Sequence, residues 1–124
     1  MASFVLATAE RSNLADQLKT DLNAGYLKLY TAGYATLLVS IPLANPCGSV
    51  TNGVLTLDTT NMNANAGDSG VAAGGRFYKS DDSTPVADCD VSTSGATVNL
   101  DNTSINSGQN VSITSGTITV PAGT

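Results

Sequence analysis

The feature that most restricts the fold is a series of short β-type segments that fills the chain from residue 26 onward. Apolar and polar residues alternate within the segments, and clusters of Asn, Gly, Asp, Ser and Pro separate them. The segments are residues 26–30, 35–41, 54–57, 71–79, 86–91, 97–101, 111–113 and 117–120. Asn52-Gly53 is typical of a hairpin turn, and residues 81–85 and 106–110 are also expected to be turns. This pattern predicts a mainly β protein, an antiparallel β-sandwich or a jelly-roll-like barrel of about seven or eight strands.

One amphipathic helix is expected before the strands, over residues 8–24. Its apolar residues recur at every fourth position and form one stripe, which comprises Leu14, Leu18 and Leu22. Thr8 or Ser12 is expected to cap the N-terminus, and Gly25 is expected to end the helix in a left-handed conformation. The stripe is expected to pack against the sheet or against a partner.

The chain is expected to form a single domain, residues 1–124, because no linker or change in composition divides it. Its expected parts are an apolar N-terminal arm at 1–7, the helix at 8–24 and the β-sandwich at 26–120. Within the sandwich, residues 59–70 are rich in Asn, Ala and Gly and are expected to form a loop. Gly74-Gly75 is expected to interrupt the strand at 71–79 as a bulge or kink.

Composition and charge exclude several classes of function. The chain has ten acidic and five basic residues, a net charge of −5, so it lacks the basic face that binds nucleic acid. No apolar run approaches the roughly 20 residues that span a membrane. The chain contains no His, which removes Ser-His-Asp catalysis, Cys-His catalysis and His-containing zinc sites. We therefore expect neither enzyme activity nor a cofactor or metal.

Two loop motifs resemble functional sites but fit them poorly. Gly67-Asp68-Ser69-Gly70 matches the sequence around the nucleophile of serine proteases, but without His the Ser has no base, and these residues suit a turn. Asn61, Asn63 and Asn65 have the spacing of a calcium loop, but the acidic residues of such a loop are missing. A second acidic group either converges on a cation or forms a solvated surface; it comprises Asp81, Asp82, Asp88 and Asp90.

Cys47 and Cys89 are the only cysteines of the chain. Their separation does not fit a metal-binding knuckle or a redox pair. They either form one disulfide, if the fold brings their Cα atoms within about 7 Å, or remain two small buried apolar residues in a reducing cytoplasm.

Two groups of residues are candidates for contact with other proteins. Tyr26 and Tyr30 share one face of a strand and Tyr34 follows shortly after, so they form either an aromatic contact patch or ordinary cross-strand packing. The second group is the apolar run Phe4, Val5 and Leu6, which exceeds what a hydrophobic staple requires. This arm either adds a strand to the domain or docks on a partner.

Three parts of the chain together carry a resemblance to known proteins. They are the amphipathic helix with the strand Leu27-Lys28-Leu29-Tyr30-Thr31, the strand Gly-Gly-Arg-Phe-Tyr-Lys-Ser-Asp-Asp at residues 74–82, and the polar stretch at residues 98–119. In composition and order, over nearly the whole chain, they resemble a group of small virion proteins of tailed bacteriophages. The resemblance includes no catalytic motif.

The resemblance implies a non-enzymatic virion structural protein, most like a capsid cement (decoration) protein at the seams of the head shell. The implied partners are the major capsid protein and neighbouring copies of the chain, so we expect a homo-oligomer on the capsid surface, made in the cytoplasm of the host bacterium. Another virion part, such as a tail, neck or head-completion protein, is the first alternative. The second is a carbohydrate-binding β-sandwich with the tyrosines as stacking platforms, although the chain has no Trp.

Overall fold

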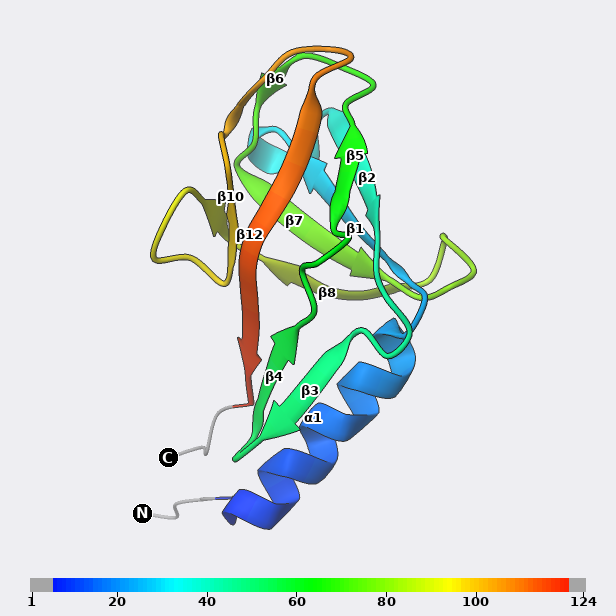
Figure 1. The fold of residues 1–124 in the computed structure, drawn as a ribbon, viewed down its shortest axis with the longest axis vertical. Helices are drawn as coiled ribbons and strands as arrows, with labels where there is room; N and C mark the ends of the chain where they lie inside the picture. Colours follow the sequence, from blue (N-terminus) through cyan, green and yellow to red (C-terminus); the bar gives the residue numbers. More distant parts are fainter. Residues whose placement is uncertain (1–5, 121–124) are drawn as a thin grey trace.

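One long helix precedes a series of short strands in the computed structural model, which describes residues 6–120 (Figure 1). The helix α1 (Thr8–Leu22) is followed by β1 (Tyr26–Tyr30), the 3-10 turn η1 (Ala32–Tyr34) and β2 (Leu37–Pro42). The remaining strands are β3 (Gly48–Thr51), β4 (Val54–Leu57), β5 (Asn63–Asn65), β6 (Gly70–Val71), β7 (Gly74–Tyr78), β8 (Pro85–Cys89), β9 (Val91–Ser92), β10 (Val98–Leu100), β11 (Ser104–Ile105) and β12 (Asn110–Thr119).

The strands form three sheets. One sheet has the order β2-β1-β7-β8, the second has the order β3-β4-β12-β10-β9 with β5 also paired to β12, and the third pairs β11 with β6. The pairs are antiparallel except for β10 with β9, which is parallel. The protein is therefore mainly β with one N-terminal helix, as the sequence predicts, and residues 6–120 form no closed barrel.

The number of strands is larger than expected, because several strands are only two or three residues long. β5, β6, β9, β10 and β11 are of this kind. β10 lies inside the predicted segment 97–101, whereas β5, β6, β9 and β11 are too short to show an alternation of their own. Residues 59–70 illustrate the error. They were expected to be a loop, but they contain β5 and bury the side chains of Met62 and Ala66.

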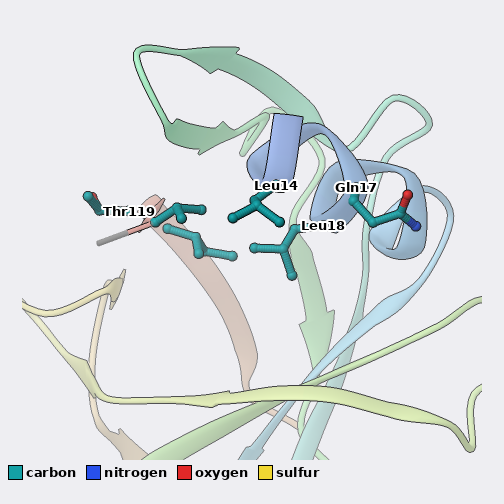
Figure 2. Close-up of a pocket in the computed structure, with 6 residues that line it drawn as sticks. Leu14, Gln17, Leu18 and Thr119 are labelled. Carbon is teal, nitrogen blue, oxygen red and sulfur yellow. The ribbon is translucent and has the colours of Figure 1, made fainter. Parts of the chain in front are cut away.

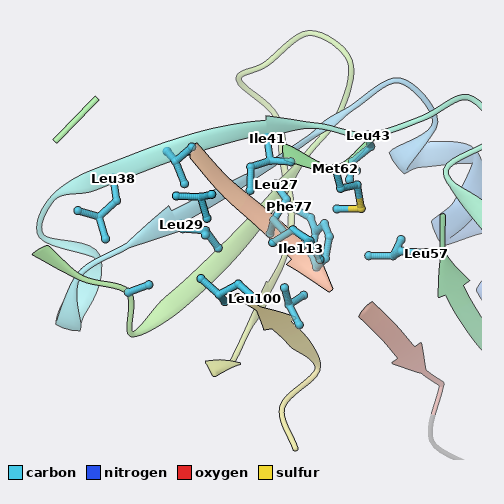
Figure 3. Packing of buried hydrophobic residues seen from close by; sticks show 14 of the residues in the cluster. Leu27, Leu29, Leu38, Ile41, Leu43, Leu57, Met62, Phe77, Leu100 and Ile113 are labelled. Carbon is cyan, nitrogen blue, oxygen red and sulfur yellow. The ribbon is translucent and has the colours of Figure 1, made fainter. Parts of the chain in front are cut away.

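One hydrophobic core joins the two larger sheets. Figure 3 shows Leu27, Leu29 and Phe77 of the four-stranded sheet close to Leu100 and Ile113 of the six-stranded sheet. No polar or charged residue is fully buried among residues 6–120, so this core is entirely apolar. Its stability depends on hydrophobic burial and close packing.

The ends of α1 differ from the prediction. The helix ends at Leu22, two residues early, and Ala24 rather than Gly25 takes the left-handed conformation with φ of 59°. Gly25 is needed for a different reason, since a Cβ there would collide with the carbonyl oxygen of Tyr78. The N-cap is Ala7, without a side-chain hydrogen bond, and the hydroxyl of Ser12 instead accepts a hydrogen bond from the Gly53 N–H at 3.0 Å.

The turn chemistry of the strands is partly as expected. Asn52 and Gly53 have φ of 52° and 80°, and they join β3 to β4 as the predicted hairpin turn. Gly74 and Gly75, however, form no bulge, because both lie in regular register with β1. The irregularity in β7 lies between Phe77 and Tyr78, opposite β8.

Residues 6–120 contain no membrane-spanning helix, because α1 is neither long nor apolar enough to cross a membrane.

Candidate functional site

The outer face of the four-stranded sheet gathers all four tyrosines of the chain. In β1, alternation buries Leu27 and Leu29, so the residues between and beside them face outward. The antiparallel register sets Tyr26 opposite Tyr78 and Lys28 opposite Arg76. We call this surface the tyrosine face; it comprises Tyr26, Lys28, Tyr30, Tyr34, Arg76 and Tyr78, all partly exposed.

Arg76 is the centre of the tyrosine face. Its guanidinium carbon lies 4.3 Å from the ring centroid of Tyr34 and 5.9 Å from that of Tyr30. Its Nε donates a hydrogen bond of 2.6 Å to Oδ1 of Asp88, and a terminal nitrogen donates one of 3.3 Å to Oδ2. This fork raises the pKa of Arg76 and lowers the pKa of Asp88, so both groups remain charged.

A second cation and a tyrosine pair extend the face along β1. Nζ of Lys28 lies 4.5 Å from the ring centroid of Tyr78 and 2.9 Å from Oδ1 of Asp82. The hydroxyls of Tyr30 and Tyr78 lie 3.1 Å apart. Burial and this hydrogen bond raise the pKa of Tyr30 to about 12, whereas the same hydrogen bond lowers the pKa of Tyr78. Either hydroxyl can be the donor in this pair.

Tyr34 reaches the face through an unusual backbone conformation. Its φ is 56°, after Gly33 with φ of 71°, and a left-handed conformation is rare for a bulky residue. The ring packs edge-on against Tyr30, with centroids 5.3 Å apart, and its hydroxyl donates to the Gly75 carbonyl at 3.4 Å. A Cβ at Gly74 would lie 3.2 Å from this ring, so the glycine makes room for it. The strain at Tyr34 is held by these contacts, as is common at functional sites.

An apolar cleft forms a second candidate site, between α1 and the end of β12 (Figure 2). It has a volume of about 400 Å³ and is lined by Leu14, Gln17, Leu18, Ile118, Thr119 and Val120. Figure 2 shows Leu14 and Leu18 pointing into the space between the helix and the strand, whereas Gln17 points away from it. Leu14 is 48% exposed, so the described residues cover only part of the leucine stripe, for which packing against the sheet or against a partner is expected.

The residues predicted as an interface have different outcomes. Phe4 and Val5 lie outside the described residues, and Leu6 is partly buried just before the helix. Tyr26, Tyr30 and Tyr34 do share one surface, where Tyr30 contacts Tyr34. Sequence reasoning missed Lys28, Arg76 and Tyr78 as members. The alternation in residues 26–30 already placed Lys28 between two tyrosines, but no local signal pairs β1 with β7.

The acidic residues considered as a cation site each have a separate partner. Asp82 pairs with Lys28 and Asp88 pairs with Arg76, whereas Asp81 accepts hydrogen bonds from Thr84 and Asp90 accepts one from the Thr97 N–H. These hydrogen bonds lower the pKa of Asp81 to about 2 and also lower the pKa of Asp90. Within residues 6–120, no three acidic or cysteine side chains are grouped so that they could hold a metal.

The motif Gly67-Asp68-Ser69-Gly70 forms hydrogen bonds within its own turn and to the turn at Ser107. The Asp68 carboxylate accepts a hydrogen bond from the Ser69 N–H at 2.8 Å, and the Ser69 hydroxyl accepts one from the Ser107 N–H at 2.8 Å. The amide of Asn110 similarly donates to Asn63 and Asn65 across β12 and β5. These polar residues connect strands and turns that are distant in the sequence.

The two cysteines are free thiols, so they form no disulfide, and Cys89 is only partly buried. Cys47 is buried, and its N–H donates to the Asn23 side-chain oxygen at 2.9 Å. Burial raises the pKa of Cys47, and burial with the nearby charges of Asp90 and Asp88 raises the pKa of Cys89 to about 12. Both thiols are therefore protonated at neutral pH and are weak nucleophiles.

Among residues 6–120, the tyrosine face and the apolar cleft are thus the candidate functional sites. The first is suited to directional polar and aromatic contacts, and the second is suited to an apolar side chain. Comparisons of the chain with protein-family models, with curated proteins and with solved structures give no match.

Proposed function

We propose that the protein is a non-enzymatic virion structural protein of a tailed bacteriophage, a capsid cement protein. In this role it binds the major capsid protein and neighbouring copies of itself on the capsid surface. The observation that carries the proposal is the tyrosine face, where four tyrosines share a partly exposed sheet face with Arg76, whose guanidinium lies over the rings of Tyr30 and Tyr34. Tyr and Arg are the residues that protein interfaces favour most, together with Trp.

The geometry of the face suits association with another protein. Arg76 and Lys28 are each neutralised by an aspartate, so covering the face buries no unpaired charge. Tyr30, Tyr34 and Tyr78 are held by one another and by the cations, which reduces the conformational entropy lost on binding. The left-handed backbone conformation of Tyr34 is a second indication. Such a strained conformation persists only where the surrounding contacts enforce it, and residues of this kind cluster at functional sites.

The choice of partner rests on the resemblance to small tailed-phage virion proteins. A capsid presents many identical sites on a symmetric lattice, so weak contacts made by many copies add to a stable coat. A net charge of −5 also suits an outer surface better than contact with packaged DNA. A carbohydrate-binding role has less support, because the rings of Tyr34 and Tyr78 already stack with cations of the same chain.

Quantitative mass spectrometry of purified virions tests the proposed role directly. A cement protein is expected at a copy number comparable with that of the major capsid protein. A copy number that is a small fraction of this would indicate a neck or tail component instead. Absence of the chain from the particles would contradict a virion role altogether.

The variant Tyr34→Gly tests the tyrosine face itself. Glycine adopts the left-handed conformation freely, so the loss of ring contacts is partly offset by relief of about 1–3 kcal/mol of strain. We expect a folded protein with near-normal stability whose affinity for particles lacking the chain falls roughly thirty-fold, the loss of about 2 kcal/mol typical of a central interface residue.

The matched control for this variant is Thr56→Ala, on an exposed position of β4 in the other large sheet. This variant is expected to bind particles like the wild type. Unchanged binding by a folded Tyr34→Gly variant would show that the tyrosine face takes no part in association. Equal losses in both variants would also contradict the assignment, because they would indicate a general effect of altering the surface.

A further inference from the structure

The apolar cleft leaves large aliphatic side chains uncovered at one end of the molecule. Leu14 is the exposed member, and Leu18, Ile118 and Val120 complete the apolar lining. The cleft lies near the start of α1, since the Val120 N–H donates to the Gly53 carbonyl and the Gly53 N–H donates to the Ser12 hydroxyl. An occupant of this cleft therefore needs apolar side chains and access from the N-terminal end of the helix.

The chain carries such a segment immediately before the helix. Phe4 and Val5 precede Leu6 and the N-cap residue Ala7 in the sequence, and they lie outside the described residues. Ala7 precedes Leu14 by seven residues and Leu18 by eleven, and these spacings place all three on one face of a helix. The arm therefore joins the domain on the side that carries the cleft.

The length of the arm matches the distance to the cleft. Leu14 lies about 10 Å along the helix axis from Ala7, at about 1.5 Å per residue. Helical side chains tilt toward the N-terminus, which brings the Leu14 side chain closer to Ala7. Three extended residues reach about 10 Å, so Phe4 can reach the level of Leu14 and of the end of β12. An aromatic side chain at that point has enough apolar surface to cover the exposed leucine.

We propose that Phe4 and Val5 of the same chain occupy the cleft between α1 and β12. The tether supports this choice over the arm of another copy, because a segment a few residues away has a high effective concentration at the site. The occupied cleft joins the helix to the end of β12 and removes exposed apolar surface from this end of the molecule. The inference does not depend on the proposed virion role, and it leaves the tyrosine face free for partners.

The absence of Trp from the chain gives a direct test. Phe4→Trp introduces a single tryptophan, whose fluorescence reports only on the arm. We expect blue-shifted emission and several-fold weaker quenching by acrylamide than for free tryptophan, with both properties unchanged on dilution. Solvent-exposed emission at every concentration would overturn the proposal. A blue shift that disappears on dilution, together with a dimer mass in light scattering, would assign the cleft to a second copy and would also overturn it.

A paired substitution locates the site of the tryptophan. In the Phe4→Trp background, Leu14→Asp is expected to restore exposed emission, because it places a carboxylate in the cleft. The matched control is Val71→Asp, which changes another exposed large aliphatic residue on β6, at the opposite end of the molecule from the helix start (Figure 1). This control should keep the blue shift. A blue shift retained in both folded variants would show that the arm binds elsewhere and would overturn the proposal.

Discussion

The tyrosine face and the apolar cleft hold their side chains by different means. On the tyrosine face, Arg76 and Lys28 each have a carboxylate partner and a tyrosine ring within 4.5 Å. In the cleft, aliphatic side chains meet without polar partners, and Leu14 remains largely uncovered. The cations of the tyrosine face thus have their partners within the same chain. In the cleft, by contrast, residues 6–120 leave part of the apolar lining exposed to solvent.

The reason for the difference lies in how the hairpin of β3 and β4 lies along α1. Its turn reaches past Leu14 toward the start of the helix, because the Gly53 N–H donates to the Ser12 hydroxyl and a Cβ at Gly53 would lie 2.8 Å from Cβ of Arg11. Leu14 is exposed because it faces the end of β12 across the open cleft. The tyrosine face has no such gap, because β1 and β7 are both five residues long and pair along their whole length.

The largest expected effect separates the two ends of the leucine stripe. Leu22 is 1% exposed in the core, so Leu22→Asp buries an unpaired carboxylate and costs several kcal/mol, comparable with the stability of the whole domain. Leu14→Asp, at the exposed end, should leave the protein folded, and Leu18→Asp should fall between them. Thermal and urea unfolding of the three variants measures this gradient. Equal losses at Leu14 and Leu22 would mean that the cleft is closed by something as rigid as the core.

The sequence indicated the local secondary structure, but it did not show which distant segments of the chain contact one another. The alternation at residues 26–30 correctly placed Tyr26 and Tyr30 on one face, and the 3.6-residue period correctly indicated one helix. The pairing of β1 with β7 depends on residues far apart in the chain, so Arg76 and Tyr78 could not be assigned to that face. The same limit applies to Leu14, because periodicity identifies an apolar stripe but not which of its residues another element covers.

A second prediction concerns the packing beneath the tyrosine face. A Cβ at Gly75 would lie 3.0 Å from Sγ of Cys89 and 3.2 Å from Cδ1 of Leu27. Gly75→Ala should therefore destabilise the protein by about 1–3 kcal/mol through overpacking. The double variant Gly75→Ala with Cys89→Ala should recover part of this loss, because the sulfur is removed. Equilibrium unfolding measures both effects, and a double variant that loses as much as the sum of the two single variants would contradict this contact.

A smaller effect is expected for the hydroxyl pair on the same face. Tyr30→Phe keeps the ring beside Tyr34 and removes the hydroxyl paired with that of Tyr78, so it should cost only about 0.5 kcal/mol at this partly exposed site. The pKa of Tyr78 should rise, because the hydrogen bond with Tyr30 is the main cause that lowers it. An NMR titration of the Tyr78 ring tests this. A Tyr78 pKa that is unchanged or lower in the variant would contradict this role of the hydrogen bond.

The smallest expected effect is a change in stability that depends on pH on the tyrosine face but not in the cleft. The fork from Arg76 lowers the pKa of Asp88 below its ordinary value of 3.8, so the carboxylate stabilises the fold above that pH, and this contribution is lost as the pH falls through the lowered value. Asp88→Asn should therefore reduce the free energy of unfolding slightly at pH 7, and its difference from the wild type should shrink below pH 3.8. Salt should also reduce the difference, because the pair is exposed.

Ile118→Ala in the cleft provides the contrast. Its expected loss of stability is about 1–2 kcal/mol and is the same at pH 7 and in acid, because an aliphatic contact does not titrate. Urea unfolding of both variants from pH 7 down to acid tests the contrast. A loss for Asp88→Asn that does not change with pH would mean that the Arg76–Asp88 pair contributes by packing alone, and the electrostatic account of the tyrosine face would be wrong.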